Sequence, residues 1–541
     1  MSDSTLKLST QFLKQLFDEV FFNHLQKMKK IRKLLLALSI PLILSNSGLN
    51  QSNNHKDPKS PNNLNIIIFT ADDLGPNGVG LESFGGKMSG LTPNIDKIAN
   101  AGVRFTNAYV NSSICMPSRG IIATGMYGFN SGHHGFFYAR EEVNTMMEAL
   151  RSAGYKTGIL GKVAHSATKM STIWDYVYDK EDLGSGRSPS KYYERTKAFV
   201  NKCKSEDQPF YLMVNSHDPH RPFQEPNGEL LDGAEWPSKL YSPEEVFVPG
   251  FLPDIPQVRK ELSYYYNSTR RLDDTFGKVM EALEDVGVLE NTVIVFLSDN
   301  GIAMPFSKAN CYLKATRTSM FVHRPGVYKP KVYNNHFIET IDLYPTLMDM
   351  LGQNKPKGID GKSFLPLLEG KSQKGRAVAF TQIDYINQST PYPMRSVQDL
   401  KFGYIFNPWS DNIVTYKNAN EGEVINAMQA LTENEEIQAR VALHRHRVVE
   451  EFYDLKNDPN CLVNLANNDD YKTEMKKYRK ILKAKMRQNG DPLLEAFNNI
   501  DDKEKMKSLY LELYSSVLKY KEGDVEAYNS KIDTMQVNNY E

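Results

Sequence analysis

Oxygen-bearing side chains follow two strongly apolar segments of the sequence. Asp72 and Asp73 end the run NIIIFTADD, and Asp299 and Asn300 end the run NTVIVFLSDN. Each pair alone is weak evidence, because such pairs also make turns or cap helices. Together they offer three carboxylates and an amide, which are hard donors that suit Ca²⁺ or Mg²⁺ better than a soft transition metal. We therefore expect a divalent cation, Ca²⁺ or Mg²⁺, where these two segments end.

The segment from Cys115 to Arg119, Cys-Met-Pro-Ser-Arg, is the most specific pattern in the chain, and a Thr-Gly pair follows it. An isolated cysteine would be assigned to the core. This segment instead matches the C-x-P-S-R signature of type I sulfatases. From Asn65 to about Asn467 the chain resembles that family, which belongs to the alkaline-phosphatase-like superfamily. The resemblance implies that a formylglycine-generating maturation enzyme converts Cys115 to formylglycine, which attacks the sulfur of a sulfated saccharide.

The resemblance also assigns roles to other residues. The family's catalytic positions match Cys115, Arg119, Lys162, His165, His217 and Lys308. The resemblance implies one Ca²⁺ per chain, and the family's metal ligands match Asp72, Asp73, Asp299, Asn300 and the modified Cys115. The words HDPHR, SDNGI and YPMRSVQ are similar to those of one branch, the N-sulfoglucosamine sulfohydrolases or heparan sulfamidases. Two features depart from that branch: Lys308 stands in place of an arginine, and the GKVAH spacing is similar to that of iduronate sulfatases.

These assignments imply a mechanism. A sulfate ester or sulfamate is ringed by negative oxygens, so the enzyme must surround it with positive charge, which Ca²⁺, Arg119 and two lysines supply. One hydroxyl of the hydrated formylglycine is the nucleophile, and Asp299 accepts its proton. His217, assisted by Lys308, protonates the leaving amine or alcohol. His165 takes a proton from the second hydroxyl, which expels sulfate.

Other interpretations of these and neighbouring residues stay open. His133 and His134 in SGHHG favour a structural turn or pocket wall, while His220, Arg221 and Arg395 fit either a sugar contact or a structural salt bridge. The alternative enzymes are an O-sulfatase for another sulfated polysaccharide and a phosphoester or phosphonate hydrolase of the same superfamily. A catalytically silent protein that only binds sulfated glycans is less favoured, because every catalytic position is filled.

Four apolar runs must position these residues, and they cover 65–73, 154–162, 209–217 and 291–300. Helical patterns lie between them, as at NIDKIANAG and TMMEALRSAG, each ending in a glycine where a left-handed cap would sit. Alternating strands and helices predict an α/β fold with a doubly wound, mostly parallel sheet of the alkaline-phosphatase-like kind. Ligands bind beyond the carboxyl ends of such strands, where all four runs carry polar residues.

Shorter apolar runs after Gly370, namely RAVAFTQID, LKFGYIFNP and EEFYDLKND, predict a smaller C-terminal α+β part with an antiparallel sheet. From about Tyr471 the sequence is charged and helical. We therefore predict five segments: an extension plus signal peptide (1–49), a linker (50–63), a catalytic domain (64–370), a C-terminal subdomain (371–480) and a helical tail (481–541).

Basic residues at 27–33 precede an apolar stretch at 34–44 and a small polar run, which is the order of a secretory signal. An amphipathic surface helix is the alternative. The stretch is too short to span a bilayer, and Met28 is a candidate start. We expect a secreted or periplasmic protein without stable membrane insertion. The 65 basic and 65 acidic residues cancel, so no long-range field favours nucleic acid. Cys203, Cys311 and Cys461 lack zinc-site spacing and are expected to be small buried hydrophobes.

Overall fold

The computed structural model describes residues 64–520 except 173, 387–390, 412–413 and 419–421. The four predicted apolar runs all form strands. They are β1 (Asn65–Ala71), β3 (Lys156–Leu160), β5 (Phe210–Asn215) and β6 (Thr292–Ser298). Every residue of β1, β5 and β6 is buried, as expected for strands that are covered on both faces.

The larger sheet has nine described strands, and its centre is parallel. The order is β4-β3-β5-β1-β6-β7-β2-β8, with β9 paired to β2. The remaining strands are β2 (Val103–Tyr109), β4 (Tyr176–Tyr178), β7 (Arg317–His323), β8 (Lys331–Tyr333) and β9 (Ile338–Glu339). Strands β3, β5, β1 and β6 are adjacent and mutually parallel, so their carboxyl ends share one edge. Among the described strands of this sheet, only β7 is antiparallel to its neighbours, which are β6 and β2.

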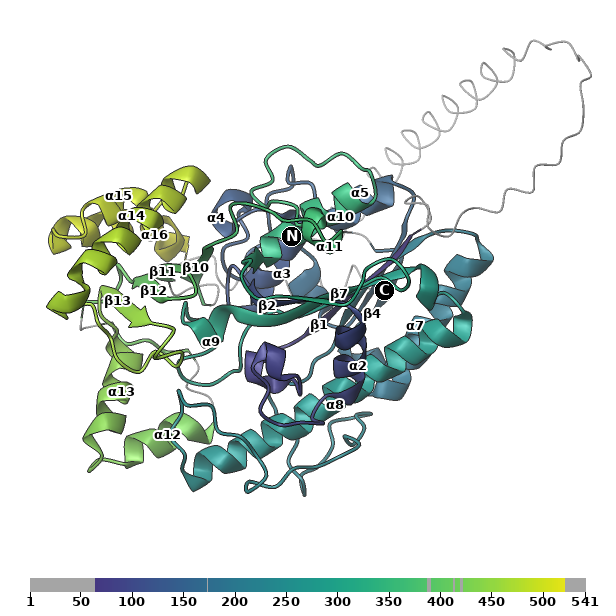
Figure 1. The fold of residues 1–541 in the computed structure, drawn as a ribbon, viewed down its shortest axis with the longest axis horizontal. Helices are drawn as coiled ribbons and strands as arrows, with labels where there is room; N and C mark the ends of the chain where they lie inside the picture. The colour runs from purple at the N-terminus through teal and green to yellow at the C-terminus, as the bar shows by residue number, and fades with distance from the viewer. Residues whose placement is uncertain (1–63, 173, 387–390, 412–413, 419–421, 521–541) are drawn as a thin grey trace, which may run out of the picture. The chain divides into compact units, whose positions relative to one another are not determined.

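Helices cover both faces of this sheet, as Figure 1 shows. One face packs against α2 (Pro93–Ala101), α7 (Pro189–Ser205) and the long α8 (Pro256–Val286), and the other against α5 (Met146–Ser152), α10 (Leu343–Met350) and α11 (Leu365–Leu368). Alternate side chains of β1 divide between the two cores: Ile67 and Phe69 belong to the first, and Ile66 and Ile68 to the second. This alternation follows from the two-residue period of a strand.

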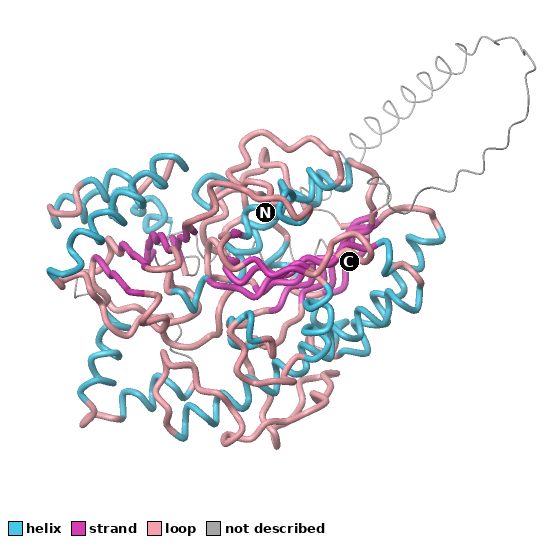
Figure 2. Tube along the Cα trace, in the orientation of Figure 1, coloured by secondary structure: helices cyan, strands magenta, loops and turns pink. Residues whose placement is uncertain are grey.

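A second sheet is antiparallel and has the order β10-β11-β12-β13. Its strands are β10 (Ala379–Tyr385), β11 (Pro391–Gln398), β12 (Phe402–Phe406) and β13 (Glu450–Asp454). Figure 2 shows it as a separate group of strands. The predicted strands match β10, β12 and β13, whereas β11 was not predicted. Helices α14 (Lys472–Asn489), α15 (Leu494–Asn498) and α16 (Lys503–Tyr520) confirm the helical character after Tyr471.

One of the two predicted glycine caps is wrong. Gly154 has φ +90°, in the left-handed region, but Gly102 is extended with φ −109° because the chain passes directly from α2 into β2. The predicted segment limits stay an interpretation. The larger sheet ends before Gly370 and β10 begins at Ala379, while α14 continues across residue 480.

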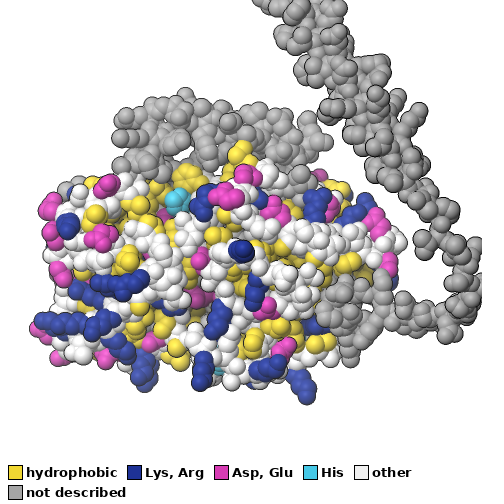
Figure 3. Space-filling model, turned by 90° about the horizontal axis from the view of Figure 1, so that it is seen from above, with side chains coloured by type: hydrophobic (Ala, Val, Ile, Leu, Met, Phe, Trp, Pro, Cys, Tyr) yellow, Lys and Arg dark blue, Asp and Glu magenta, His cyan; other side chains and the backbone are white. Residues whose placement is uncertain are grey.

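The predicted signal sequence and linker lie outside the described residues. Within residues 64–520, leaving aside the gaps, no helix is long and apolar enough to cross a membrane. All four cysteines are free and buried, as predicted for Cys203, Cys311 and Cys461. Acidic and basic side chains both lie on the face shown in Figure 3, in keeping with the balanced charge of the chain.

Candidate active site

The two pairs of oxygen donors meet at the carboxyl edge of the larger sheet. Ala71 of β1 pairs with Ser298 of β6, so the residues that follow these two strands are neighbours. The Asp73 backbone N–H donates to Asp299 Oδ1 at 3.1 Å. Asp73 adopts φ +68°, a left-handed conformation that turns the chain sharply after β1. The structure therefore brings Asp72, Asp73, Asp299 and Asn300 together, and all four are buried.

Asp73 is the most heavily contacted of these carboxylates. Its Oδ1 accepts from Asn300 Nδ2 at 2.6 Å, and its two oxygens lie 2.6 and 2.8 Å from Lys308 Nζ. Asn300 Oδ1 is buried and has no hydrogen-bond partner among the described residues. Buried carboxylates beside an unpartnered amide oxygen are the donor set of a hard cation. These residues thus fit the predicted Ca²⁺.

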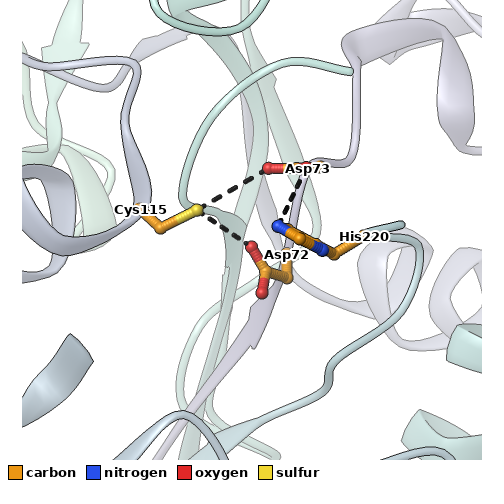
Figure 4. A group of neighbouring side chains, drawn as sticks. All are labelled: Asp72, Asp73, Cys115 and His220. Atoms are coloured by element: carbon orange, nitrogen blue, oxygen red, sulfur yellow. Dashed lines mark hydrogen bonds and ion pairs between the residues drawn. The ribbon is translucent and has the colours of Figure 1, made fainter. Parts of the chain in front are cut away.

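Cys115 is the first residue of α3 (Cys115–Thr124) and points at the carboxylates (Figure 4). Its Sγ lies 3.3 Å from Asp72 Oδ1 and 3.8 Å from Asp73 Oδ1. Burial, and next the carboxylate of Asp72, raises the pKa of the Cys115 thiol well above its ordinary value. Burial and the nearby carboxylates thus disfavour the thiolate, which is the nucleophilic form of cysteine.

Arg119, one turn into α3, links four elements of the site. Its Nε and a terminal nitrogen donate to Asp299 Oδ2 at 3.0 and 2.8 Å. Its other terminal nitrogen donates to Thr70 Oγ1 at 2.9 Å and to Asn215 Oδ1 at 2.6 Å. Arg119 is fully buried. It orients Asp299 rather than facing open solvent.

Lys162 and His165 come from the segment after β3. Lys162 forms an ion pair with Asp72 Oδ2. Burial alone would raise the pKa of Asp72, but Lys162, followed by His220 and Arg119, holds it well below its ordinary value. The His165 ring packs edge-on against Phe136 with centroids 5.5 Å apart. Burial, and next Lys162, lowers the pKa of His165 to about 3.

His217 and His220, three residues apart, have different surroundings. His217 Nε2 accepts from the Lys162 backbone N–H at 3.1 Å, so in this arrangement it carries no proton. His220 Nδ1 lies 2.6 Å from the Arg221 carbonyl, and its Nε2 lies 3.8 Å from Asp73 Oδ2. Because Nδ1 is engaged by this carbonyl, Nε2 is the His220 nitrogen that is available for proton exchange, and it faces the carboxylates (Figure 4). The possible ligand atoms of Asp72, Asp73, Cys115 and His220 all lie within 4.8 Å of one another.

His220 is the residue that the sequence reasoning left out of the site. The available signal was the second histidine of HDPHR, but sequence alone gave no reason to rank it above the first. Burial lowers the pKa of both histidines. The His220 side chain is 32% exposed against 11% for His217, so His220 has the greater access to solvent.

Two further residues with open interpretations form internal ion pairs. Arg221 pairs with Glu261. Arg395 is fully buried between Asp384, at 2.9 Å, and Asp491, at 2.5 Å, so it braces the C-terminal region instead of facing a sugar. His133 is also fully buried, which agrees with a structural position.

Comparison with known proteins places the chain in a family. Residues 64–353 match the Sulfatase family, and residues 303–447 match "N-sulphoglucosamine sulphohydrolase, C-terminal". The human N-sulphoglucosamine sulphohydrolase is 32% identical over 378 residues, which cover 63% of this chain and 73% of that protein. A Formosa agariphila ulvan-active sulfatase is 27% identical over 80% of this chain and 76% of its own length.

Solved structures share the fold at low sequence identity. One, described in complex with its substrate D-glucosamine-2-N,6-O-disulfate, has a TM-score of 0.58 and 19% identity, and the match covers 79% of this chain and 98% of that one. A phosphonate monoester hydrolase of Agrobacterium radiobacter also has a TM-score of 0.58, at 18% identity, over 79% and 96% of the two chains. Since the family model spans residues 64–353, more than half of the sequence, this chain belongs to the sulfatase family of sulfate ester and sulfamate hydrolases.

Proposed function

We propose that this chain removes sulfate from a sulfated saccharide by means of formylglycine at position 115 and one bound Ca²⁺, with the sulfamate of N-sulfoglucosamine as its preferred group. The observation that carries the proposal is the position of Cys115. Its Sγ lies 3.3 Å from Asp72 Oδ1, at a point where three carboxylates and three cationic side chains converge.

The surroundings of Cys115 support modification rather than thiol chemistry. Burial and the carboxylate of Asp72 raise the pKa of the thiol and so disfavour the thiolate, the form that could attack an anionic sulfate. Formylglycine, when formed, supplies a hydrated aldehyde whose hydroxyl attacks sulfur. A maturation enzyme is therefore part of the proposal.

The cation would be held by Asp72, Asp73, Asp299 and Asn300 together with the modified residue 115. When bound, Ca²⁺ supplies positive charge beside the nucleophile and the sulfate oxygens. Lys162 and Lys308 already pair with Asp72 and Asp73. We assign their ammonium groups a second role, as donors to the sulfate oxygens.

We assign the proton transfers from the positions of Asp299 and of the three histidine rings. Asp299, held by Arg119, accepts the proton of the nucleophile. His220 protonates the leaving group through Nε2, which faces the centre. The step uses the doubly protonated ring, which the carboxylate of Asp73 favours although burial opposes it. His217, first predicted for this role, instead accepts from the Lys162 N–H and supports the turn after β3. His165 stays the predicted acceptor for the step that releases sulfate.

The choice of N-sulfoglucosamine rests on relatives. The match of residues 303–447 is to the C-terminal part of N-sulphoglucosamine sulphohydrolases, and the human enzyme of that name is 32% identical. A neighbour in fold was solved with a glucosamine that carries both 2-N and 6-O sulfate. Secretion or a periplasmic location fits such a substrate and remains part of the proposal.

The test is sulfate release by the matured protein from four substrates: N-sulfoglucosamine, 6-O-sulfated glucosamine, 2-O-sulfated uronate and galactose sulfate. Release from N-sulfoglucosamine is expected to be fastest. Cys115→Ala is expected to abolish release, whereas Cys203→Ala, at a buried cysteine on α7, is the matched control and keeps it. Release only from an O-sulfated sugar would replace the sulfamidase assignment with an O-sulfatase.

A phosphonate hydrolase is the second candidate, favoured by the fold shared with the Agrobacterium radiobacter enzyme. Rates on p-nitrophenyl sulfate and on a p-nitrophenyl phosphonate separate the two. The sulfatase proposal requires faster turnover of the sulfate.

A further inference from the structure

The two charged residues that flank His220 in the HDPHR segment, Asp218 and Arg221, both form internal ion pairs. Asp218 is fully buried, and its Oδ2 lies 2.7 Å from Arg271 Nε while its Oδ1 lies 3.0 Å from another Arg271 nitrogen. Arg187 Nε donates to the same Oδ1 at 3.2 Å. One carboxylate thus receives two guanidinium groups, from the segment before α7 and from α8.

Arg187 also holds the backbone of this segment. One of its terminal nitrogens donates to the carbonyl of His220 at 2.8 Å, and lies 3.4 Å from the carbonyls of His217 and Arg221. The Arg187 side chain is only 6% exposed. A planar guanidinium can serve a carboxylate and several carbonyls at once, and an ammonium cannot reproduce that geometry.

The same segment touches the ligand cluster through its backbone. The Asp218 carbonyl accepts from the Asp72 N–H at 3.1 Å. On the far side of His220, Arg221 pairs with Glu261 and donates to the Ala303 carbonyl at 3.2 Å. His220 therefore sits on a short loop that is fixed at both ends, and its ring projects toward Asp73.

We propose that Arg187 is a positioning residue for the reaction: by binding Asp218 and the His220 carbonyl, it fixes the direction in which His220 Nε2 points. This inference rests on the proposed function, in which His220 protonates the leaving group. A buried ion pair is weak evidence for stability, because desolvation offsets much of its attraction. Arg187 differs from an ordinary structural arginine because it also binds backbone carbonyls of the His220 loop and so fixes the conformation of that loop.

The test measures a ratio that protein folding does not change. It is kcat/KM for N-sulfoglucosamine divided by kcat/KM for p-nitrophenyl sulfate, on the same preparation. Loss of active protein lowers both values equally. Displacement of a proton donor lowers mainly the first, because an amine must be protonated to leave whereas a nitrophenolate leaves with little help.

Four variants are compared with the wild type. His220→Ala sets the scale and is expected to lower the ratio by about 10² to 10⁴, the usual loss of a general acid. Arg187→Lys and Asp218→Asn are each expected to lower it by about 10- to 100-fold, mostly through kcat, because a small displacement of a catalytic group is costly. Arg395→Lys alters another buried arginine, which has two carboxylate partners, and its ratio should stay at the wild-type value.

The outcomes separate the two proposals. A lowered ratio in His220→Ala together with wild-type ratios in Arg187→Lys and Asp218→Asn would overturn the positioning role and leave the proposed function standing. A wild-type ratio in His220→Ala would overturn both the donor assignment and the positioning role. Wild-type protein that releases no sulfate from either substrate would overturn the proposed function itself. Since the ratio needs only residual activity, a variant that folds poorly still gives an answer.

Discussion

Replacing Arg119 with methionine removes the partner of a buried carboxylate at the centre of the site. Asp299 is fully buried and accepts two hydrogen bonds from Arg119, which also donates to Thr70 and Asn215. Methionine fills most of the arginine's space but offers no donor. The Asp299 charge then loses its direct guanidinium partner.

The size of the effect follows from two opposing terms. Breaking a buried ion pair by removing one partner usually costs about 3–5 kcal/mol. Asp299 can limit this cost by taking up a proton, because burial, and next Asp72, already raises its pKa to about 7, while Arg119 opposes that rise. At neutral pH we therefore expect a loss near the lower end, about 3 kcal/mol.

This loss converts to a measurable shift of the thermal midpoint. With an unfolding entropy of about 2.1 cal/mol/K per residue, a unit the size of residues 64–520 has about 1 kcal/mol/K, so the midpoint should fall by about 3 °C. Differential scanning fluorimetry or calorimetry gives this shift. The double variant Arg119→Met/Asp299→Asn should recover part of it, because the carboxylate is then neutral.

The control is Arg317→Met, which removes a partly buried arginine whose Nε donates to the Thr106 carbonyl. If Arg119→Met shifts the midpoint no more than this control, or if Asp299→Asn gives no recovery, the buried charge is not what Arg119 compensates. The reasoning about the Arg119–Asp299 pair would then be refuted.

Three more predictions concern the modification, the cation and acid stability. Mass analysis of active protein should show the Cys115 peptide lighter by the thiol-to-aldehyde change; full activity with an intact thiol would contradict it. Chelation should abolish turnover and lower the thermal midpoint, and added Ca²⁺ should restore both. In Asn300→Ala, which lacks the unpartnered amide oxygen, added Ca²⁺ should restore them less completely. Undiminished activity without metal would rule the site out. Burial lowers the pKa of His133 to about 4, so folding favours the neutral imidazole. The stability that this neutral ring gives the folded state is fully present above about pH 6.5, and it is lost as the pH falls through about 4. Between pH 7 and pH 4, the free energy of unfolding should therefore fall by up to about 3 kcal/mol less in His133→Met than in the wild type. Equal decreases in the two proteins would contradict this.

The central strands and the polar residues at their ends could be predicted because both signals are local. A continuous apolar run marks a strand buried on both faces, and parallel strands bring their carboxyl ends to one edge. This reasoning placed Asp72 and Asp299 together across 227 residues of sequence, and the structure brings their strands into direct pairing. Strand β11 was missed because Pro391 and Pro393 argue against a central strand. The structure tolerates them beside an irregularity in the pairing with β10.

The choice between His217 and His220 could not be made from the sequence, for a physical reason. A short motif such as HDPHR determines which side chains are available, but it does not determine which of them points into the site. That direction depends on where Asp218 and the loop carbonyls are held, and they are held by Arg187 and Arg271, at positions 31 and 53 residues away from Asp218. Neither arginine carries a local pattern that marks it as functional, since each would be read as an ordinary residue of its helix or loop. The role proposed for His220 therefore depends on the fold, because residues outside the motif determine where its ring lies.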